Sequence, residues 1–418
     1  MSTIEVGNHA AEQFDDADLP EHSATAMAPE PASDPTLWFG VRWSTARLLL
    51  EVLAPGLSYL AVREIGLLLL GWMTARNGTT ITKALTSWDG QWYLGIASGG
   101  YTGVPAGMTD AFGRRTANTP LAFFPGYPAL VRWVGDLPGV GLVAGAFTVS
   151  LVCGVICAYG LARLGRHVSG SKVTGLILVV LFAASPMAIA LSMAYSEALF
   201  CALAAWSLVG VVERKWVLAG LCAAGTGLVR PTAAALVVTV VIAAIVAIVQ
   251  RRDGLRPWLG LVLAPAGLVA YLGYVASRTG QLTGWFVLQR QGWDSTFDGG
   301  VATVKFGLDV LATGRSVLEV GTIAVLLVAI ALVVISIRQR VAWPLVLYGT
   351  LVLAMDLGAN GLMNSKARLL LPAFTLLIPA AIGLAKRQRG TAITVLVGVV
   401  VASAWFGAYA LTGWQYAI

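Results

Sequence analysis

Residues 232–252 read TAAALVVTVVIAAIVAIVQRR, an almost unbroken run of alanine and branched aliphatic side chains that two arginines end. An α-helix needs ~20 consecutive apolar residues to cross the hydrocarbon core of a membrane. A membrane β-barrel would instead show short segments in which apolar and polar residues alternate. The stretch therefore predicts a transmembrane helix that ends at basic residues.

Comparable apolar runs recur along most of the chain. They lie near 48–74, 140–163, 171–189, 193–212, 216–230, 232–250, 257–277, 318–337, 342–361, 367–385 and 391–411. The composition agrees, because 57% of the residues are hydrophobic and only 12% are charged, about half the charged share of an average soluble protein. We therefore predict an all-α polytopic membrane protein with about eleven transmembrane helices.

Basic residues gather in every second connection between these runs. They are Arg163, Arg166, Lys172, Arg214, Lys215, Arg251, Arg252, Arg256, Arg338, Arg340, Lys386, Arg387 and Arg389. Cytoplasmic loops carry an excess of Lys and Arg, so we predict that these connections and the N-terminus are cytoplasmic. The two long polar segments, 75–139 and 278–317, are then extracytoplasmic loops. Residues 121–135 are apolar but short, and a span there would reverse every later helix, so we expect an interfacial or re-entrant helix.

Residues 1–40 differ from the rest, because they are rich in Ala, Pro, Asp, Glu and Ser and have nothing with which to build a core. They predict a disordered cytoplasmic tail, which leaves 41–418 as the transmembrane domain. The net charge of +7 would favour nucleic-acid binding in a soluble protein. Here most basic side chains end membrane helices, so no nucleic-acid partner is expected. The four cysteines lie inside apolar runs and are expected in the core, and no metal or cofactor is predicted.

A loop rich in aromatic residues, Ser87-Trp88-Asp89-Gly90-Gln91-Trp92-Tyr93, follows the first apolar run. Trp and Tyr at a membrane boundary often form an interfacial belt. The acid argues for more than a belt, since a partly desolvated carboxylate between two indoles is suited to act as a general base. The ring faces of Trp88, Trp92 and Tyr93 would also suit the apolar faces of a sugar. The loop is therefore a candidate functional site.

Other polar residues lie on the same predicted side of the membrane. Arg230 ends an apolar run, where an arginine is costly unless it is paired or liganded. Glu197 begins another run and could stabilise a helix N-terminus. The remaining candidates are Gln289, Arg290, Trp293, Lys366 and Arg368. Guanidinium groups fit phosphate oxygens and an acid can deprotonate a hydroxyl, so the set suits glycosyl transfer from a polyprenyl-phosphate sugar.

Several short motifs resemble the GPI mannosyltransferase 2 (PIG-V-like) family and its bacterial relatives. The motifs are Trp88–Tyr93, Ile96-Ala97, Gly100-Tyr101, Phe123–Pro128, Tyr195–Phe200, Arg230–Thr232, Gln289-Arg290 with Trp293, and Arg368–Phe374. They occur in the family's order over residues 85–375. Two positions depart from the family pattern, because Gly126 stands where a bulkier residue is common and Thr232 where eukaryotic relatives tend to have asparagine.

The resemblance implies a GT-C-type glycosyltransferase of the bacterial plasma membrane, with its active site outside and mannose as the expected sugar. It maps the family's catalytic acid onto Asp89, which we expect to be the base of an inverting single displacement. The donor phosphate is expected to bind Arg230, Arg290, Arg368 and Lys366. Sugar and acceptor are expected to contact Trp88, Trp92, Tyr93, Tyr127, Glu197, Gln289 and Trp293. The expected acceptor is a cell-envelope glycolipid, a glycan or a secreted protein.

Two other functions stay open at this point. A lipid-linked sugar flippase or transporter would carry ionisable groups within the membrane, and Glu51, Glu64 and Asp356 lie in apolar runs. The two halves of the chain show no convincing repeat of the kind that many transporters have. A non-catalytic partner of another envelope glycosyltransferase would keep the fold without needing the acid and the arginines.

Overall fold

The structure is a computed structural model that describes residues 43–314, 316–361 and 363–414. Within these ranges helices dominate, and the only β pairing is a bridge between Phe297 and Ala359. The chain divides into a small unit, Met1–Glu51, and a large one, Val52–Ile418. The large unit contains the helix bundle and the cavity. The predicted disordered tail at 1–40 lies outside the described residues.

Five helical segments in the described ranges are long and apolar enough to cross a membrane. They are Leu48–Arg76 of α1 (Trp43–Arg76), α5 (Leu142–Ser169), Arg256–Thr279, α14 (Val317–Arg338) and α18 (Arg389–Thr412). A sixth candidate is the bent pair Met363–Leu369 and Leu371–Ala385. The shorter apolar helices are α6 (Lys172–Ala183), α7 (Glu197–Val212), α8 (Trp216–Gly227), α9 (Ala233–Val249) and α15 (Trp343–Gly358). Each predicted apolar run contains one of these segments, which confirms the all-α polytopic membrane fold.

Three of the predicted runs, 171–189, 257–277 and 367–385, are broken or shortened. The second run contains α10 (Arg256–Leu263) and α11 (Ala266–Thr279). The third contains α16 (Lys366–Leu369), η4 (Leu371–Leu377) and α17 (Ile378–Ala385), and η3 (Met363–Ser365) precedes it. Pro186, Pro265 and Pro372 lie at the breaks. Proline lacks an amide donor and disfavours helical geometry in the residue before it. A run can therefore stay apolar across a proline while its helix ends there.

Residues 184–196, between α6 and α7, contain only the short 3-10 helix η2 (Ala188–Ser192). Side chains of α1, α5 and α18 donate to the backbone of this segment or of the residue before it. These bonds run from Arg63 Nη1 to Ala183 O (2.8 Å), from Ser150 Oγ to Met193 O (2.8 Å) and from Ser403 Oγ to Ser185 O (2.8 Å). Backbone polar groups inside a membrane need partners within the protein, so these donors stabilise the unwound approach to α7.

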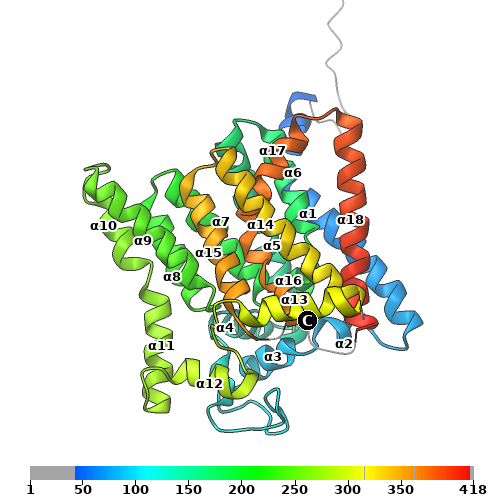
Figure 1. The fold of residues 1–418 in the computed structure, drawn as a ribbon, viewed down its shortest axis with the longest axis vertical. Helices are drawn as coiled ribbons and strands as arrows, with labels where there is room; N and C mark the ends of the chain where they lie inside the picture. Colours follow the sequence, from blue (N-terminus) through cyan, green and yellow to red (C-terminus); the bar gives the residue numbers. More distant parts are fainter. Residues whose placement is uncertain (1–42, 315, 362, 415–418) are drawn as a thin grey trace, which may run out of the picture. The chain divides into compact units, whose positions relative to one another are not determined.

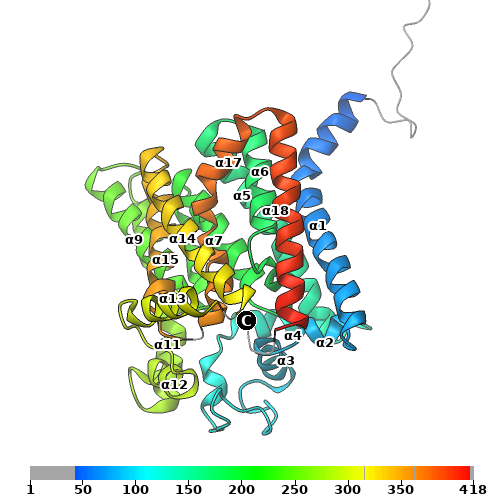
Figure 2. The ribbon, with the colours of Figure 1, turned by 45° about the vertical axis from the view of Figure 1, so that its right-hand side comes forward.

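Both long polar segments contain short helices. They are α2 (Ile81–Leu85), α3 (Asp89–Gly99), η1 (Thr119–Ala122) and α4 (Gly126–Gly135) in the first, and α12 (Gly284–Trp293) and α13 (Val301–Thr313) in the second. Figures 1 and 2 show α3 and α12 at one end of the bundle and the connection between α17 and α18 at the opposite end. The two segments thus meet at one end, and the side of the membrane that this end faces stays a prediction.

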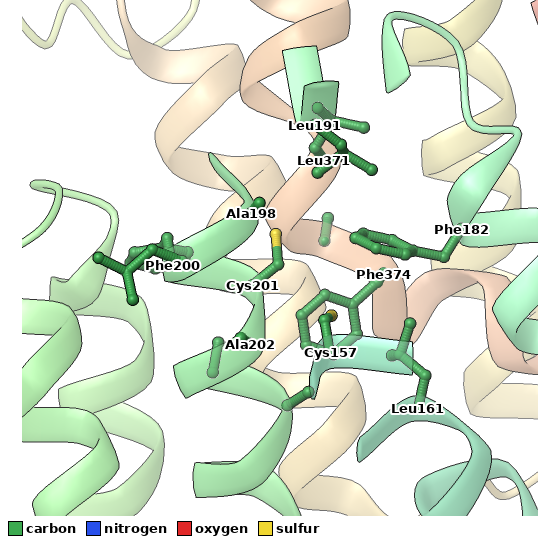
Figure 3. Packing of buried hydrophobic residues seen from close by; sticks show 14 of the residues in the cluster. Cys157, Leu161, Phe182, Leu191, Ala198, Phe200, Cys201, Ala202, Leu371 and Phe374 are labelled. Atoms are coloured by element: carbon green, nitrogen blue, oxygen red, sulfur yellow. The ribbon is translucent and has the colours of Figure 1, made fainter. Parts of the chain in front are cut away.

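The centre of the bundle is packed by side chains from α5, α6, α7 and η4 (Figure 3). Phe182 and Phe374 meet edge to face, with ring centroids 6.0 Å apart. Cys157 and Cys201 are fully buried beside them as free thiols, and Cys153 is also buried, so their predicted place in the core is confirmed. Cys222 was expected there too, but it is only half-buried. This packing brings the start of α7 close to α16, where the charged residues of the site lie.

Candidate active site

Asp89 is the first residue of α3, and an unusual turn precedes it. Trp88 has φ of +50° and ψ of −116°, a strained backbone for a residue with a Cβ atom. After this turn the Asp89 carboxylate meets Arg368, whose Nη1 donates to Asp89 Oδ2 at 2.8 Å. The Asp89 side chain remains 31% exposed and lines a cavity. A ligand in that cavity can therefore reach the carboxylate.

Glu197, at the start of α7, is fully buried and lies between two arginines. Its Oε1 atom is 2.5 Å from Arg230 Nη1 and 3.5 Å from Arg368 Nε. Burying a charge is costly unless an opposite charge accompanies it, and here two carboxylates face two guanidinium groups. We call Asp89, Arg368, Glu197 and Arg230 the paired-charge cluster. Its formal charges cancel, and only Glu197 is sealed from the cavity.

Neutral side chains orient the two arginines of this cluster. Arg230 Nη1 donates to Ser196 Oγ at 3.3 Å, and that oxygen lies 2.9 Å from Tyr93 OH. Burial raises the pKa of Tyr93 to about 12, so its phenol stays protonated at neutral pH. Arg368 Cζ is 5.0 Å from the centre of the Tyr195 ring, a cation–π contact. The guanidinium groups are thus held in place without further charge.

The cavity beside the cluster has a volume of about 430 Å³, within the range of small-molecule sites. The predicted site residues in its wall are Asp89, Tyr93, Arg230, Gln289, Trp293, Lys366 and Arg368. Apolar residues form much of the rest, including Phe123, Phe124, Leu268, Leu272, Trp285, Phe286, Phe297, Val352 and Met355. A polar region and a broad apolar region therefore share one cavity, which suits a ligand with a polar head and an apolar tail.

The other predicted aromatic residues lie behind the wall. Trp92 stacks on Phe123 with ring centroids 5.1 Å apart and meets the edge of Trp293 at 6.2 Å. Tyr127 is buried, and its hydroxyl donates to Ala146 O at 3.0 Å. Trp88 is half-buried against the main core. Trp92 and Tyr127 thus pack against residues of the wall, and none of the three predicted aromatics is itself part of it.

Arg290 is exposed and is not part of the cavity wall. Its neighbours on α12, Gln289 and Trp293, do line the cavity. Residues four apart share one face of a helix, whereas adjacent residues point to different faces. The motif keeps Gln289 and Arg290 together in the chain, but α12 turns their side chains apart.

Hydrogen bonds to η1 and α4 position the cavity wall. Gln289 Nε2 and Trp285 Nε1 both donate to Ala122 O, at 3.1 and 3.3 Å. The amide of Gly126 donates to Leu228 O at 2.7 Å. A Cβ atom at Gly126 would lie only 2.8 Å from that carbonyl oxygen. The close approach to the end of α8, just before Arg230, therefore explains why position 126 needs a glycine.

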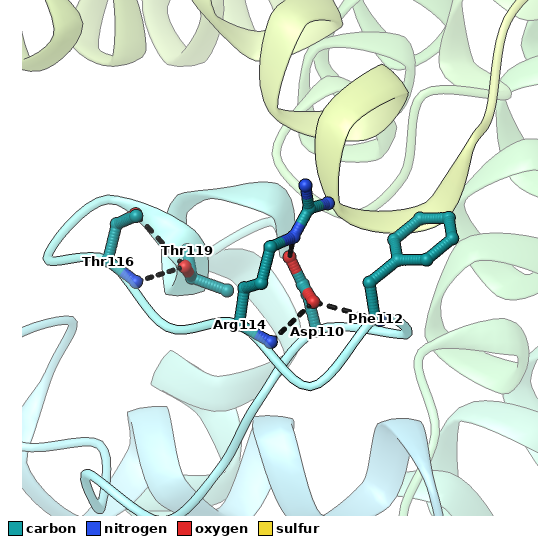
Figure 4. A network of polar contacts seen from close by, with 5 residues as sticks. All are labelled: Asp110, Phe112, Arg114, Thr116 and Thr119. Atoms are coloured by element: carbon teal, nitrogen blue, oxygen red, sulfur yellow. Dashed lines mark hydrogen bonds and ion pairs between the residues drawn. The ribbon is translucent and has the colours of Figure 1, made fainter.

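The loop between α3 and η1 is tied to α12 (Figure 4). Asp110 Oδ1 accepts from the amides of Phe112 and Arg114 at 2.9 Å, and Arg114 Nε lies 3.3 Å from Asp110 Oδ2. Beside this turn the Ala111 amide donates to Gly292 O at 3.0 Å. The first long segment thereby attaches to the second, close to Trp293.

The cavity wall also contains polar residues that the motifs did not select, namely Ser295, Thr296, Asp356 and Ser365. The sequence did carry a signal for one of them, because Asp356 lies in an apolar run, where a carboxylate is costly and often functional. Nothing in the sequence indicated that this acid faces the same cavity as Asp89. That juxtaposition comes from the packing of α15 beside α16.

No protein-family model matches the sequence, and no curated protein matches it. Among solved structures, ArnT from Cupriavidus metallidurans bound to undecaprenyl phosphate is similar, with a TM-score of 0.50. The match covers 88% of this chain and 76% of that chain at 15% sequence identity. The likeness supports the predicted GT-C-type membrane fold. The finer resemblance to the PIG-V-like family stays a prediction.

Proposed function

We propose that this chain is a membrane glycosyltransferase that moves a sugar from a polyprenyl-phosphate donor to an acceptor hydroxyl outside the cytoplasm. The observation that supports this function best is a cavity that is lined both by Asp89, Arg230 and Arg368 and by a broad set of apolar side chains. A sugar phosphate with a polyprenyl chain has matching polar and apolar parts. The ArnT structure, which holds undecaprenyl phosphate, supports this class of donor.

In the proposed reaction Asp89 accepts the proton of an acceptor hydroxyl while that oxygen attacks the anomeric carbon. The new glycosidic C–O bond forms as the bond from the anomeric carbon to the phosphate oxygen breaks. The polyprenyl phosphate leaves with the bonding electron pair, and a single displacement inverts the anomeric centre. General-base catalysis contributes roughly 10²–10⁴-fold, and Asp89 is the only carboxylate of the paired-charge cluster that a substrate can reach.

The arginines stabilise the phosphate that leaves. A guanidinium group has five N–H donors, so Arg368 can keep its bond to Asp89 and still donate to a phosphate oxygen. Arg230 lines the cavity from the turn before α9. Donors placed where charge develops lower the barrier without reorganising during the reaction. Lys366 adds positive charge nearby, and the exposed Arg290 is assigned to the rim.

We further propose mannose as the donor sugar and a cell-envelope glycolipid, glycan or secreted protein as the acceptor, on the strength of the motif resemblance. The test uses membrane vesicles from a bacterial strain that produces the chain, so that native acceptors are present. Undecaprenyl-phosphate mannose, glucose and arabinofuranose are supplied in turn, and products are identified by mass. Transfer of mannose, absent with Asp89→Asn, is expected. Transfer of another sugar alone would overturn the mannose assignment.

The same vesicles separate the alternative functions. Movement of undecaprenyl-phosphate mannose across the bilayer without any glycosylated product would favour a flippase. Binding of that lipid without turnover, and without any effect of Asp89→Asn, would favour a non-catalytic partner of another transferase. Either result would replace the proposed transfer reaction.

A further inference from the structure

Asp356, on the last turn of α15, belongs to the cavity wall, and its buried carboxylate has no hydrogen-bond partner in the part of the chain that the structure describes. Its residue is 5% exposed and forms part of the cavity wall. Among the described residues neither of its carboxylate oxygens has a hydrogen-bond partner. A buried carboxylate without hydrogen bonds is costly, and each unsatisfied buried group in a folded protein needs an explanation.

The neighbouring lysine does not satisfy this acid. Lys366 Nζ donates to the backbone oxygens of Asp356 and Ala359, the latter at 2.8 Å. These carbonyls lie at the end of α15, where helix carbonyls lack partners within the helix. Lys366 therefore caps α15, and its ammonium group is held beside the Asp356 carboxylate without bonding to it.

The Ser365 hydroxyl resembles the Asp356 carboxylate in this respect. Its residue is 3% exposed, it lines the cavity, and its Oγ atom has no partner among the described residues. We call Asp356, Ser365 and Lys366 the open cluster. Asp356 and Ser365 line the cavity, while their carboxylate and hydroxyl oxygens are covered and lack partners among the described residues. Rotation of these two side chains would bring the oxygens to a ligand in the cavity.

The chemistry of the open cluster selects its ligand. Carboxylate oxygens accept hydrogen bonds and donate none, so the ligand must supply O–H or N–H groups. The formal charges of Asp356 and Lys366 cancel, so the open cluster as a whole favours neither a phosphate nor a metal cation. A neutral ring with several hydroxyl groups meets both conditions.

We infer that the open cluster binds the hydroxyl groups of the donor's sugar ring, with Asp356 accepting two of them. Lys366 and Arg368 are two residues apart on α16 and both line the cavity. A phosphate on Arg368 and a ring hydroxyl on Asp356 can therefore belong to one sugar phosphate. This inference rests on the proposed function and adds the group that recognises the sugar.

The test measures binding, so it does not depend on turnover. Full-length protein in nanodiscs is titrated with undecaprenyl-phosphate mannose and with undecaprenyl phosphate, which has no sugar. The wild type is expected to bind the mannosyl lipid more tightly. Asp356→Ala is expected to lose about tenfold in affinity for the mannosyl lipid, the size of a hydrogen bond to a charged group, and none for undecaprenyl phosphate.

Asp309→Ala is the matched control, since Asp309 is exposed on α13 and does not line the cavity; it should bind both lipids as the wild type does. If Asp356→Ala does not fold, Asp356→Asn keeps the shape and is expected to lose affinity for the mannosyl lipid alone. Equal weakening toward both lipids, or no weakening, overturns the inference while leaving the proposed function standing. A wild type that binds neither lipid overturns both.

Discussion

The paired-charge cluster and the open cluster lie at one cavity, yet they differ in how their charged groups are paired. In the first, two carboxylates and two guanidinium groups form ion pairs with one another, and they come from α3, α7, the turn before α9, and α16. In the second, Asp356 has no partner among the described residues and Lys366 is used to cap α15. Arg368 and Lys366 connect the two clusters through a single turn of helix.

This difference separates two tasks. A cluster whose charges are already compensated keeps its geometry when a substrate arrives, which is the condition for stabilising charge that develops during a reaction. A cluster with unsatisfied acceptors gains hydrogen bonds only when a ligand enters, which is the condition for recognising that ligand. The first cluster is therefore assigned to chemistry and the second to sugar recognition.

The largest expected effect comes from Asp89→Asn. An amide keeps an oxygen that can accept from Arg368, so the protein should fold, but it cannot take up a proton at neutral pH. Turnover in vesicles should fall roughly 10²–10⁴-fold, while undecaprenyl-phosphate binding stays near the wild-type value. Wild-type turnover in this variant would remove Asp89 from its assigned role.

Glu197→Ala should lower the stability of the folded protein rather than turnover alone. Two buried guanidinium groups lose the acid between them, and removing one partner of a buried ion pair costs about 3–5 kcal/mol. Thermal unfolding in detergent measures the loss, and Glu213→Ala serves as a control at the partly exposed pair with Arg163. A Glu197→Ala protein as stable as the control variant would contradict the view that Glu197 holds the arginines.

Arg368→Lys tests the geometry of the paired-charge cluster. Lysine keeps the charge but loses the planar fork that reaches Asp89 and Glu197 together. We expect the donor KM to rise about tenfold, the size of one hydrogen bond to a charged group. An unchanged donor KM, with stability intact, would mean that charge alone is sufficient at this position.

The smallest effect is expected from Arg290→Ala. Exposed ion pairs contribute about 0–1 kcal/mol, so the donor KM should rise less than about fivefold. Arg230→Ala, at a buried position in the cavity wall, should raise it more. A larger rise of the donor KM in Arg290→Ala than in Arg230→Ala, measured in the same vesicle assay, would contradict this assignment.

The sequence predicted the membrane class and the apolar runs, and it selected the four residues of the paired-charge cluster, because these depend on composition and on short motifs. It did not predict where runs break, since Pro186 and Pro265 leave apolarity unchanged. It also indicated which residue types belong to the site, but not which side chains they contact. The contact between Asp89 and Arg368 joins residues 279 positions apart, and only the packing of the bundle brings them together.

Two further differences have local causes. Arg290 was expected at the donor phosphate because it is an arginine in one of the family-like motifs, but it points away from the cavity that its neighbour Gln289 lines. Asp356 was considered only as a sign of a transporter, because an acid within an apolar run does not reveal which cavity it faces. Both positions required knowledge of how α12 and α15 are rotated about their axes.

The unwound segment at 184–196 has a consequence for biogenesis. Arg63 of the first span and Ser403 of the last both donate to the backbone at this segment, which leads directly into Glu197. Because α18 is synthesised long after α6 and α7, the segment that leads into Glu197 lacks the Ser403 donor while α6 and α7 are being inserted. Chains truncated before Arg389 are expected to be cut by protease between α6 and α7, whereas the full-length chain resists. The candidate site around Glu197 would then be completed only after α18 has been inserted.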